Sequence, residues 1–544
     1  MLRELVASLV HDAWLKTGFS SSPPPIEVTP AARPEFGDFA SNIAMIASKT
    51  LDMPPRKIAE DLAKHVDPSS FERIDVAGPG FLNVTLSMAA IHDALRDVLH
   101  GGTRFGESEM GTGIRMQVEF VSSNPTGPLT VGHGRQAVLG DVLASLYAQL
   151  GYEIEREYYF NDEGRQIDLL AESVWSRICQ QRGMDVAIPE EGYHGEYLIG
   201  IARDISQSES LGDTLDASTL ETLRRQAVKR MTTLIRRDLE KLGVGFDSWF
   251  SETLLHRRGD VDRALETLRE HGGTYEKDGA EWLASEDHGG KKDSVLVRSD
   301  GRPTYLLVDI AYHLDKKRRG LEEVIDVQGA DHQIEQDNVL TALQILGVPA
   351  SFLRYAVHQF VSLRENGEAL RMSTRAGRFV QLSELVDELG SDIVRYFMIA
   401  RRPSTHLEFD LDLARQESLD NPVTYIQYAH TRIASIFRKA AVTSVGDPSD
   451  LDLAPLDQPI EREMIRQLDA FPNLIFQAAT EFAPHLIAEY ALSLSRSFHA
   501  YYADHRVLCD DPRISTARLA LIEGLRLVLH RCLTILGMST PEVM

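Results

Sequence analysis

Residues 116–160 carry, in order, the hydrophobic patterns of a strand, a loop, a helix and a second strand. Met116, Val118 and Phe120 alternate with polar residues, which is typical of a strand. Apolar residues then recur at the spacing of a helix: Val138, Leu139, Val142, Leu143, Leu146 and Leu150. The strand-like run 154–160 completes a βαβ unit. Because the helix of such a unit returns the chain to the same edge, this pattern predicts a parallel sheet.

Further strand-like runs extend the expected sheet. They lie at 293–298, 323–327 and 354–358, with a helical pattern at 339–346 between the last two. Residues 161 to about 290 show mainly helical patterns, which we interpret as an insertion between the two halves of the sheet. The sequence therefore predicts an α/β fold, with a doubly wound parallel, Rossmann-type domain over 111–405.

The regions on either side of this domain have different patterns. Residues 1–110 combine amphipathic helices at both ends with the strand-like run 74–84, and the glycine-rich stretch 101–113 reads as a linker. Residues 406–544 are almost purely helical. A chain of 544 residues is several times the usual size of a domain. We therefore expect an N-terminal α+β domain and a C-terminal all-α helical bundle.

The charge of the chain limits the partners that it can bind. Its net charge of -24 argues against indiscriminate binding of nucleic acid, which depends on a dense cationic surface. A nucleic-acid partner would need local clusters of positive charge. Residues 316–319 form one such cluster, and Arg371, Arg375 and Arg378 form another. The alternative is that these are ordinary solvated charges on helices and loops.

Cysteine spacing and hydrophobicity exclude other classes of protein. Cys179, Cys509 and Cys532 lie far apart, so we expect neither disulfides nor structural zinc. No stretch supplies the roughly 20 apolar residues that a membrane span requires. The first 19 residues read as a folded helix and lack the cleavage site of a secretory signal. We therefore expect a cytoplasmic protein without a membrane partner.

The segment 119–135, EFVSSNPTGPLTVGHGR, lies where the first predicted strand gives way to the first helix. Open α/β sheets bind nucleotides at the carboxyl ends of their strands, where a helix N-terminus offers free N–H groups to phosphates. Gly132 and Gly134 would let the backbone approach a flat base, and His133 could donate to a phosphate oxygen. A Gly-His-Gly sequence alone is weak evidence, because many loops contain one.

The segment 371–379, RMSTRAGRF, is cationic, contains glycine and follows the last predicted strand of the sheet. Such a loop could close over a triphosphate and neutralise the charge of the departing pyrophosphate. Taken by itself, it could equally be a surface loop.

Several segments resemble one family, in the same order along the chain. Residues 125–133, PTGPLTVGH, resemble the HIGH region of class I aminoacyl-tRNA synthetases, and 371–375, RMSTR, resemble their KMSKS loop. Within that class, the similarity is greatest to the arginyl-tRNA synthetases. Further matching segments lie at 35–42, 77–83, 158–162, 309–316, 329–332 and 421–432. Two positions depart from the family pattern: Thr130 replaces the first HIGH histidine, and Thr374 replaces the second KMSKS lysine.

The resemblance implies roles for individual residues. A guanidinium is planar and permanently charged, so an arginine pocket needs carboxylates, and Tyr305 and Asp309 would share one helix face. The implied arginine-binding residues are Glu119, Ser122, Asn124, Tyr305, Asp309 and Gln328. The implied ATP-binding residues are Gly132, Gly134, Gly329, Asp331, His332 and Met372. The implied catalytic residues are Thr130, His133, Arg371, Ser373 and Arg375. The implied tRNA-binding residues are Phe36, Asn42, Tyr428 and Arg432.

The family's reaction gives the expected function. ATP, as its Mg²⁺ complex, would convert L-arginine to arginyl-adenylate, and tRNA(Arg) would accept the arginyl group, with release of AMP and diphosphate. The resemblance also implies a monomer whose N-terminal domain contacts the tRNA elbow and whose helical bundle binds the anticodon. Thr130 and Thr374 leave open a catalytically silent tRNA-binding paralogue. A cysteinyl or methionyl enzyme would predict zinc ligands or an apolar pocket, and the sequence contains neither.

Overall fold

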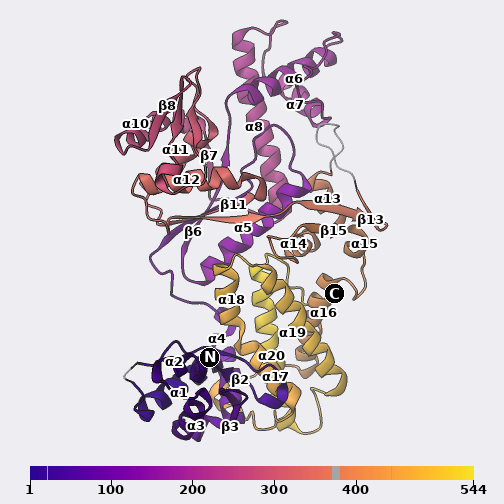
Figure 1. Ribbon diagram of the computed structural model, residues 1–544. Coiled ribbons are helices and arrows are strands. Elements are labelled where there is room, and N and C mark those ends of the chain that lie inside the picture. The colour runs from indigo at the N-terminus through magenta and orange to yellow at the C-terminus, as the bar shows by residue number, and fades with distance from the viewer. Residues whose placement is uncertain (21, 371–379, 443) are drawn as a thin grey trace.

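A five-stranded parallel sheet lies at the centre of the computed structural model, which describes residues 1–20, 22–370, 380–442 and 444–544 (Figure 1). The strands stand in the order β12-β11-β5-β6-β7, and every neighbouring pair is parallel. They are β5 (Arg115–Glu119), β6 (Glu153–Phe160), β7 (Ser248–Ser251), β11 (Glu323–Gly329) and β12 (Leu353–His358). Helix α5 (Val131–Gln149) connects β5 to β6. The predicted doubly wound parallel sheet is confirmed.

One predicted strand of this sheet was wrong, and one strand was missed. The run 293–298 forms β10 (Ser294–Val297), which pairs antiparallel with β9 (Ala280–Leu283); β9 in turn pairs with β8 (Thr274–Lys277). The parallel sheet instead gains β7, from within the predicted insertion. β7 has four residues, too few to show an alternating pattern, and the pattern of β10 does not reveal its partner.

The helical part of the insertion extends away from the sheet, at the top of Figure 1. It consists of α6 (Arg165–Gln181), α7 (Tyr197–Ser208) and α8 (Ala217–Lys241), and these helices share a small apolar core. The C-terminal half of α8 packs instead into the core beside the sheet, through Ile235 and Leu239. The chain then continues through α9 (Thr253–Arg257), α10 (Asp260–Glu270), α11 (Tyr305–Arg318) and α12 (Gln333–Ile345).

The N-terminal region is the predicted α+β unit, with one difference. The run 74–84 is two antiparallel strands and not one, because Gly78 and Gly80 adopt positive φ angles of 52° and 146° and turn the chain. The four strands stand in the order β1-β2-β4-β3. They are β1 (Val28–Pro30), β2 (Phe39–Ser41), β3 (Phe71–Ala77) and β4 (Phe81–Leu86), beside α1 (Leu2–Thr17), α2 (Ile43–Leu51), α3 (Pro55–His65) and α4 (Met88–Gly101).

The C-terminal region is a helical bundle that lies below the sheet in Figure 1 and beside the N-terminal unit. The predicted start at 406 was too early, because residues 407–410 form a strand that pairs with β13. That small sheet comprises β13 (Val361–Glu365), β14 (Glu368–Ala369) and β15 (Leu407–Asp410), near α13 (Leu382–Leu389), α14 (Ser391–Ile399) and α15 (Leu411–Ala414). The bundle helices are α16 (Pro422–Ala440), α17 (Pro459–Asp469), α18 (Phe471–Thr480), α19 (His485–Asp504) and α20 (Pro512–Ile535). None of the described helices is long and apolar enough to cross a membrane.

Candidate active site

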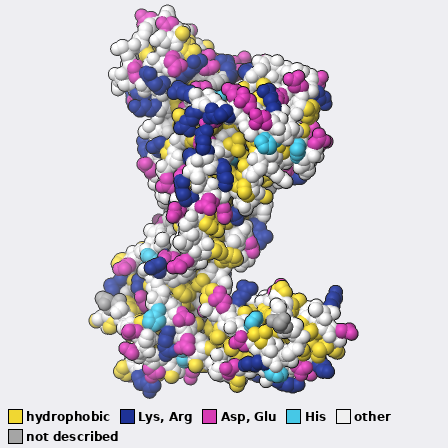
Figure 2. Space-filling view, turned by 90° about the vertical axis from the view of Figure 1, so that its left-hand side faces the viewer, with side chains coloured by type: hydrophobic (Ala, Val, Ile, Leu, Met, Phe, Trp, Pro, Cys, Tyr) yellow, Lys and Arg dark blue, Asp and Glu magenta, His cyan; other side chains and the backbone are white. Residues whose placement is uncertain are grey.

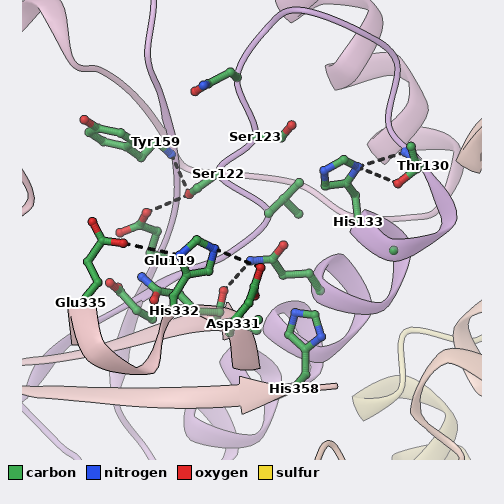
Figure 3. Close-up of a pocket in the computed structure, with 18 of the residues that line it drawn as sticks. Glu119, Ser122, Ser123, Thr130, His133, Tyr159, Asp331, His332, Glu335 and His358 are labelled. Atoms are coloured by element: carbon green, nitrogen blue, oxygen red, sulfur yellow. Dashed lines mark hydrogen bonds and ion pairs between the residues drawn. The ribbon is translucent and has the colours of Figure 1, made fainter. Parts of the chain in front are cut away.

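A cavity of about 640 Å³ lies at the carboxyl ends of β5, β11 and β12 (Figure 3). The strand order reverses between β5 and β11, and a ligand of an open α/β sheet binds at such a point. The cavity brings together most of the predicted arginine, ATP and catalytic residues: Glu119, Ser122, Asn124, Thr130, Gly132, His133, Tyr305, Asp309, Gln328, Gly329, Asp331 and His332. These residues span more than 200 positions of the sequence.

Some predicted residues lie elsewhere. Gly134 does not line the cavity: a Cβ atom there would lie 2.7 Å from Cδ1 of Leu382. Its small size therefore serves the packing of α5 against α13, and its contact with ATP stays a prediction. The predicted residues of the KMSKS-like loop lie outside the described residues: Arg371, Met372, Ser373 and Arg375.

The first turn of α5 holds the imidazole of His133 in one orientation. Thr130 precedes this helix, and its backbone N–H donates to Nδ1 of His133 over 3.0 Å. The hydroxyl of Thr130 lies 3.1 Å from the same nitrogen (Figure 3). Because Nδ1 accepts a hydrogen bond, the neutral ring carries its proton on Nε2. His133 can therefore donate from Nε2 to a ligand in the cavity.

The environment of His133 keeps it neutral. Burial, followed by the nearby His358, lowers the pKa of His133 from 6.5 to about 4. We predict that His133 does not titrate between about pH 8 and about pH 5.5, where an exposed histidine would. With ¹³C-labelled histidine, the resonance assigned through a His133→Gln variant should keep its chemical shift over that range. A titration centred near pH 6.5 would contradict this environment.

The chain turns sharply after β5. Val121 and Ser122 have positive φ angles of 69° and 40°, a strained conformation for residues other than glycine. Hydrogen bonds hold the strained turn: Oγ of Ser122 donates to Oε1 of Glu119 over 2.8 Å and accepts from the backbone N–H of Tyr159 over 3.1 Å. Both bonds are drawn in Figure 3. Ser122 therefore fixes the direction of the Glu119 carboxylate and the course of the loop that follows.

Glu119 is paired with a lysine beneath the cavity. The Lys316 ammonium, which is fully buried, donates to Oε2 of Glu119 over 2.5 Å and to Oδ1 of Asp326 over 3.0 Å. Burial and Asp326 raise the pKa of Glu119, and the charge of Lys316 opposes this rise. The predicted cationic cluster at 316–319 is largely neutralised by carboxylates, although Lys317 and Arg318 are exposed. Arg318 pairs with Asp260, and Arg319 pairs with Glu157.

Asp309 has no such partner. No described cation lies within ion-pair distance of its carboxylate, although burial, and then Glu335 and Glu119, raise its pKa well above 3.8. Tyr305 lines the same cavity from one turn earlier on α11, as the spacing predicted. The described wall carries six carboxyl groups: Glu119, Glu252, Asp309, Asp326, Asp331 and Glu335. A cavity with this excess of carboxylates fits a ligand that carries a fixed positive charge.

Several polar lining residues were absent from the prediction, among them Gln136, Tyr159, Glu252, Glu335 and His358. His358 is the last residue of β12, so the rule that sites lie at the carboxyl ends of strands could have identified it. Glu252 follows β7, the strand that was missed. Its carboxylate accepts from Tyr159, over 2.5 Å, and from Asn161, over 2.9 Å.

The residues predicted to contact tRNA lie far from this cavity in the fold. Phe36 is 39% exposed, in a 3-10 helix (Pro34–Phe36) of the N-terminal unit, and Asn42 donates to Glu27 over 2.9 Å. In the bundle, the half-buried Tyr428 stacks on His499, and the Arg432 guanidinium lies over the ring of Tyr502. Tyr501, beside Tyr502 on α19, is fully buried and cannot stack on a base.

Comparison with known proteins matches all three regions of the chain. Residues 1–86 match the family model described as the arginyl tRNA synthetase N terminal domain, 95–399 match tRNA synthetases class I (R), catalytic domain, and 426–544 match the DALR anticodon binding domain. Proteins named arginine–tRNA ligase are similar over nearly the whole chain. That of Thermotoga maritima is 43% identical over 523 residues, with 95% of each chain covered. That of Bacillus subtilis is 38% identical over 553 residues, covering 100% of this chain and 99% of the relative. The structure of Thermus thermophilus arginyl-tRNA synthetase superimposes with a TM-score of 0.79 at 25% identity, with 100% of both chains covered.

Proposed function

Because the chain belongs to the arginyl-tRNA synthetase family, we propose that the cavity described above binds arginine beside ATP and performs the first step of arginine–tRNA ligation. The reaction is the attachment of arginine to tRNA(Arg), and it consumes ATP. The observation that carries the assignment of roles is the half-buried carboxylate of Asp309, which pairs with no described cation. It supports a pocket in which the guanidinium of the substrate supplies the missing positive charge.

Within this proposal, each group at the cavity has a role set by its position. Asp309 binds the guanidinium, with Tyr305 beside it on the same helix. The polar wall is completed by Glu119 and Gln328. Lys316 and Ser122 hold the Glu119 carboxylate in place. Asn124 and Ser122 lie toward the α-amino group. The carboxylate of arginine then attacks the α-phosphorus of ATP, and arginyl-adenylate forms as diphosphate leaves.

His133 is proposed to stabilise the phosphate during this attack. The neutral imidazole donates its Nε2–H to a phosphate oxygen that gains negative charge. The Thr130 N–H donates to Nδ1 and so keeps the ring proton on Nε2. Gly132, at the exposed start of α5, leaves room for the adenosine, and Gly329, Asp331 and His332 lie opposite. Among the described residues, no cluster of three or more His, Cys, Asp and Glu side chains can hold a metal ion. We propose that Mg²⁺ arrives with ATP and is held mainly by its phosphates.

The segment 371–375 keeps its proposed role in binding the leaving diphosphate, through Arg371, Ser373 and Arg375.

The alternative of a catalytically silent paralogue has little support, because the predicted pocket residues Glu119, Asn124, Tyr305 and Asp309 are all at the cavity. Charging of tRNA(Arg) with arginine, together with ATP–pyrophosphate exchange with and without tRNA, tests the proposal. Absence of both activities would reject it, and equal activity with citrulline would reject the role of Asp309.

A second groove, which shares no lining residue with the cavity, lies beside the inserted helix α8. It is lined by residues just past the ends of β6 and β7, such as Asp162 and Thr253, and by one face of α8. Four of its cations are exposed and form no ion pair with a described carboxylate: Arg225, Lys229, Arg236 and Arg257. Figure 2 shows Lys and Arg side chains gathered on the upper part of the molecule. We propose that this groove binds the phosphates of the tRNA strand that enters the cavity.

The groove gives a prediction about tRNA binding. Arg225→Gln and Arg257→Gln should each raise the KM for tRNA by about five-fold, roughly 1 kcal/mol, and lower the salt dependence of binding by about one phosphate contact. The KM for arginine should stay unchanged. Arg237→Gln is a matched control, because Arg237 lies on the same helix but lines a different hollow, beside α7. An equal effect in this control would show that α8 acts only through its total charge.

The other two regions have proposed roles in binding tRNA. Phe36 and Asn42 would contact the tRNA elbow, and Tyr428 and Arg432 would contact the anticodon arm. We also propose that the chain acts as a monomer in the cytoplasm, because one chain carries both the cavity and the regions that would bind tRNA.

A further inference from the structure

The guanidinium of Arg395 lies where three helices meet. Arg395 is on α14, between the sheet and the helical bundle, and its side chain is fully buried. Its Nε donates to the backbone oxygen of Leu536 over 2.7 Å, and Nη1 donates to that of Leu242 over 3.2 Å. Nη2 donates to the carboxylate of Asp141 over 2.5 Å. One side chain thus joins the bundle, the inserted helix α8 and the first helix of the sheet.

Two of these contacts are at the ends of long helices. Leu242 is the C-cap of α8, and Leu536 is the C-cap of α20. The last carbonyl groups of a helix have no partner within it, and they form the negative end of the helix dipole. A buried guanidinium satisfies carbonyls of both helices and compensates both negative ends. The carboxylate of Asp141 supplies the full counter-charge to the buried guanidinium.

The third contact leads toward the cavity. Asp141 is on α5, the helix whose first turn carries His133. Its other carboxylate oxygen accepts from Nε of Arg156 on β6 over 3.1 Å. Removal of the Arg395 side chain would therefore not leave Asp141 without a partner.

The C-terminal segment strengthens the same junction. Asp392, one turn before Arg395, accepts from the backbone N–H of Ser539 over 3.0 Å. At Gly537, a Cβ atom would lie 2.1 Å from Nη2 of Arg395, so only glycine fits beside the guanidinium. Figure 1 shows the C-terminus returning to the boundary between the bundle and the sheet region. The segment that contains Gly537 and Ser539 therefore packs beside Arg395 and Asp392.

We propose that Arg395 is a positioning residue that sets the helical bundle against the catalytic domain, so that one tRNA reaches the bundle and the cavity together. This rests on the proposed function. A ligand that binds two sites gains affinity only if both can be engaged at once. The bundle also packs on α5 through α18, where the Tyr147 hydroxyl donates to the backbone oxygen of Ala479 over 3.1 Å. Variants of Arg395 should therefore keep the two parts in contact but at a less defined angle.

Steady-state charging kinetics test the proposal. Arg395→Met is expected to raise the KM for tRNA or lower kcat with tRNA, so that kcat/KM for tRNA falls by about ten-fold or more. Calorimetric affinity for arginine, measured without tRNA, should change by less than about two-fold. Arg395→Lys, which keeps the charge but reaches fewer acceptors, should lie between the wild type and Arg395→Met.

A second variant and a control separate positioning from stability. Gly537→Ala displaces the guanidinium without altering Arg395 and should reproduce the defect in kcat/KM for tRNA. Arg269→Met removes an arginine whose ion pair, with Glu281, lies within one domain, and it should leave kcat/KM for tRNA unchanged. Equal losses for tRNA and for arginine binding, or no loss in either junction variant, would overturn the proposal. A wild-type protein that does not charge tRNA with arginine would instead refute the proposed function.

Discussion

Replacement of His133 by alanine is expected to lower the rate of aminoacylation by about 10²–10³-fold and to leave the affinity for tRNA nearly unchanged. The side chain is neutral, and its Nδ1 is already occupied by the Thr130 N–H, so its remaining function is to donate from Nε2. Such a donor contributes most when charge develops on the phosphate, and its loss should therefore reduce kcat more than it raises KM for ATP. Single-turnover formation of arginyl-adenylate measures this directly.

Thr130→Val provides the matched comparison for His133. It removes the hydroxyl that lies 3.1 Å from Nδ1 but keeps the backbone N–H that fixes the tautomer. We expect a loss of less than about ten-fold, since a single neutral hydrogen bond contributes roughly 1 kcal/mol. If His133→Ala reduces rate and tRNA affinity equally, the histidine is a structural element of the α5 N-terminus.

Asp309→Asn is expected to lower kcat/KM for arginine by about 10²–10³-fold, because the buried guanidinium loses its counter-charge. The same substitution should not destabilise the free protein. Burial and neighbouring carboxylates raise the pKa of Asp309, so ionisation of this carboxyl is less favourable in the folded state than in the unfolded state. An uncharged amide avoids that cost, and the midpoint of thermal unfolding should stay equal or rise.

Glu335→Gln is the control for Asp309. Glu335 lines the same cavity, but its side chain is 37% exposed and lies beside His332, 3.4 Å from it. We expect a loss of only a few-fold in kcat/KM, because a partly exposed charge is screened by water. A large loss in Glu335→Gln with little change in Asp309→Asn would place the guanidinium at Glu335.

The sequence predicted those parts of the fold in which a local pattern is long enough to be read. The β5-α5-β6 unit combines an alternating strand with a helix of 19 residues, and the cavity forms at its predicted loop. β7 has four residues and gave no signal. The run 74–84 looked like one strand because the turn at Gly78 and Gly80 interrupts it for only three residues.

Site residues were predictable when they belonged to a segment with its own signature. The charge of Lys316 was visible in the sequence, but its partner Glu119 lies 197 positions away. The sequence does not show whether a cation is paired with a carboxylate, so the neutralisation of the charges at 316–319 was not predicted. Arg395 was missed for the same reason, because each of its three acceptors lies more than 140 positions away.

The pairing of β7 with β6 has a consequence for how the helical excursion could be altered. Two adjacent parallel strands need a crossover of a dozen or more residues, and α8 alone, which packs on the sheet core at its C-terminal half, is long enough. α6 and α7 are therefore an elaboration of a connection that the fold already needs. A chain shortened between Gly164 and Ala217, with a flexible loop in place of α6 and α7, should retain its strand order. The length of this helical insertion could therefore vary without redesign of the catalytic core.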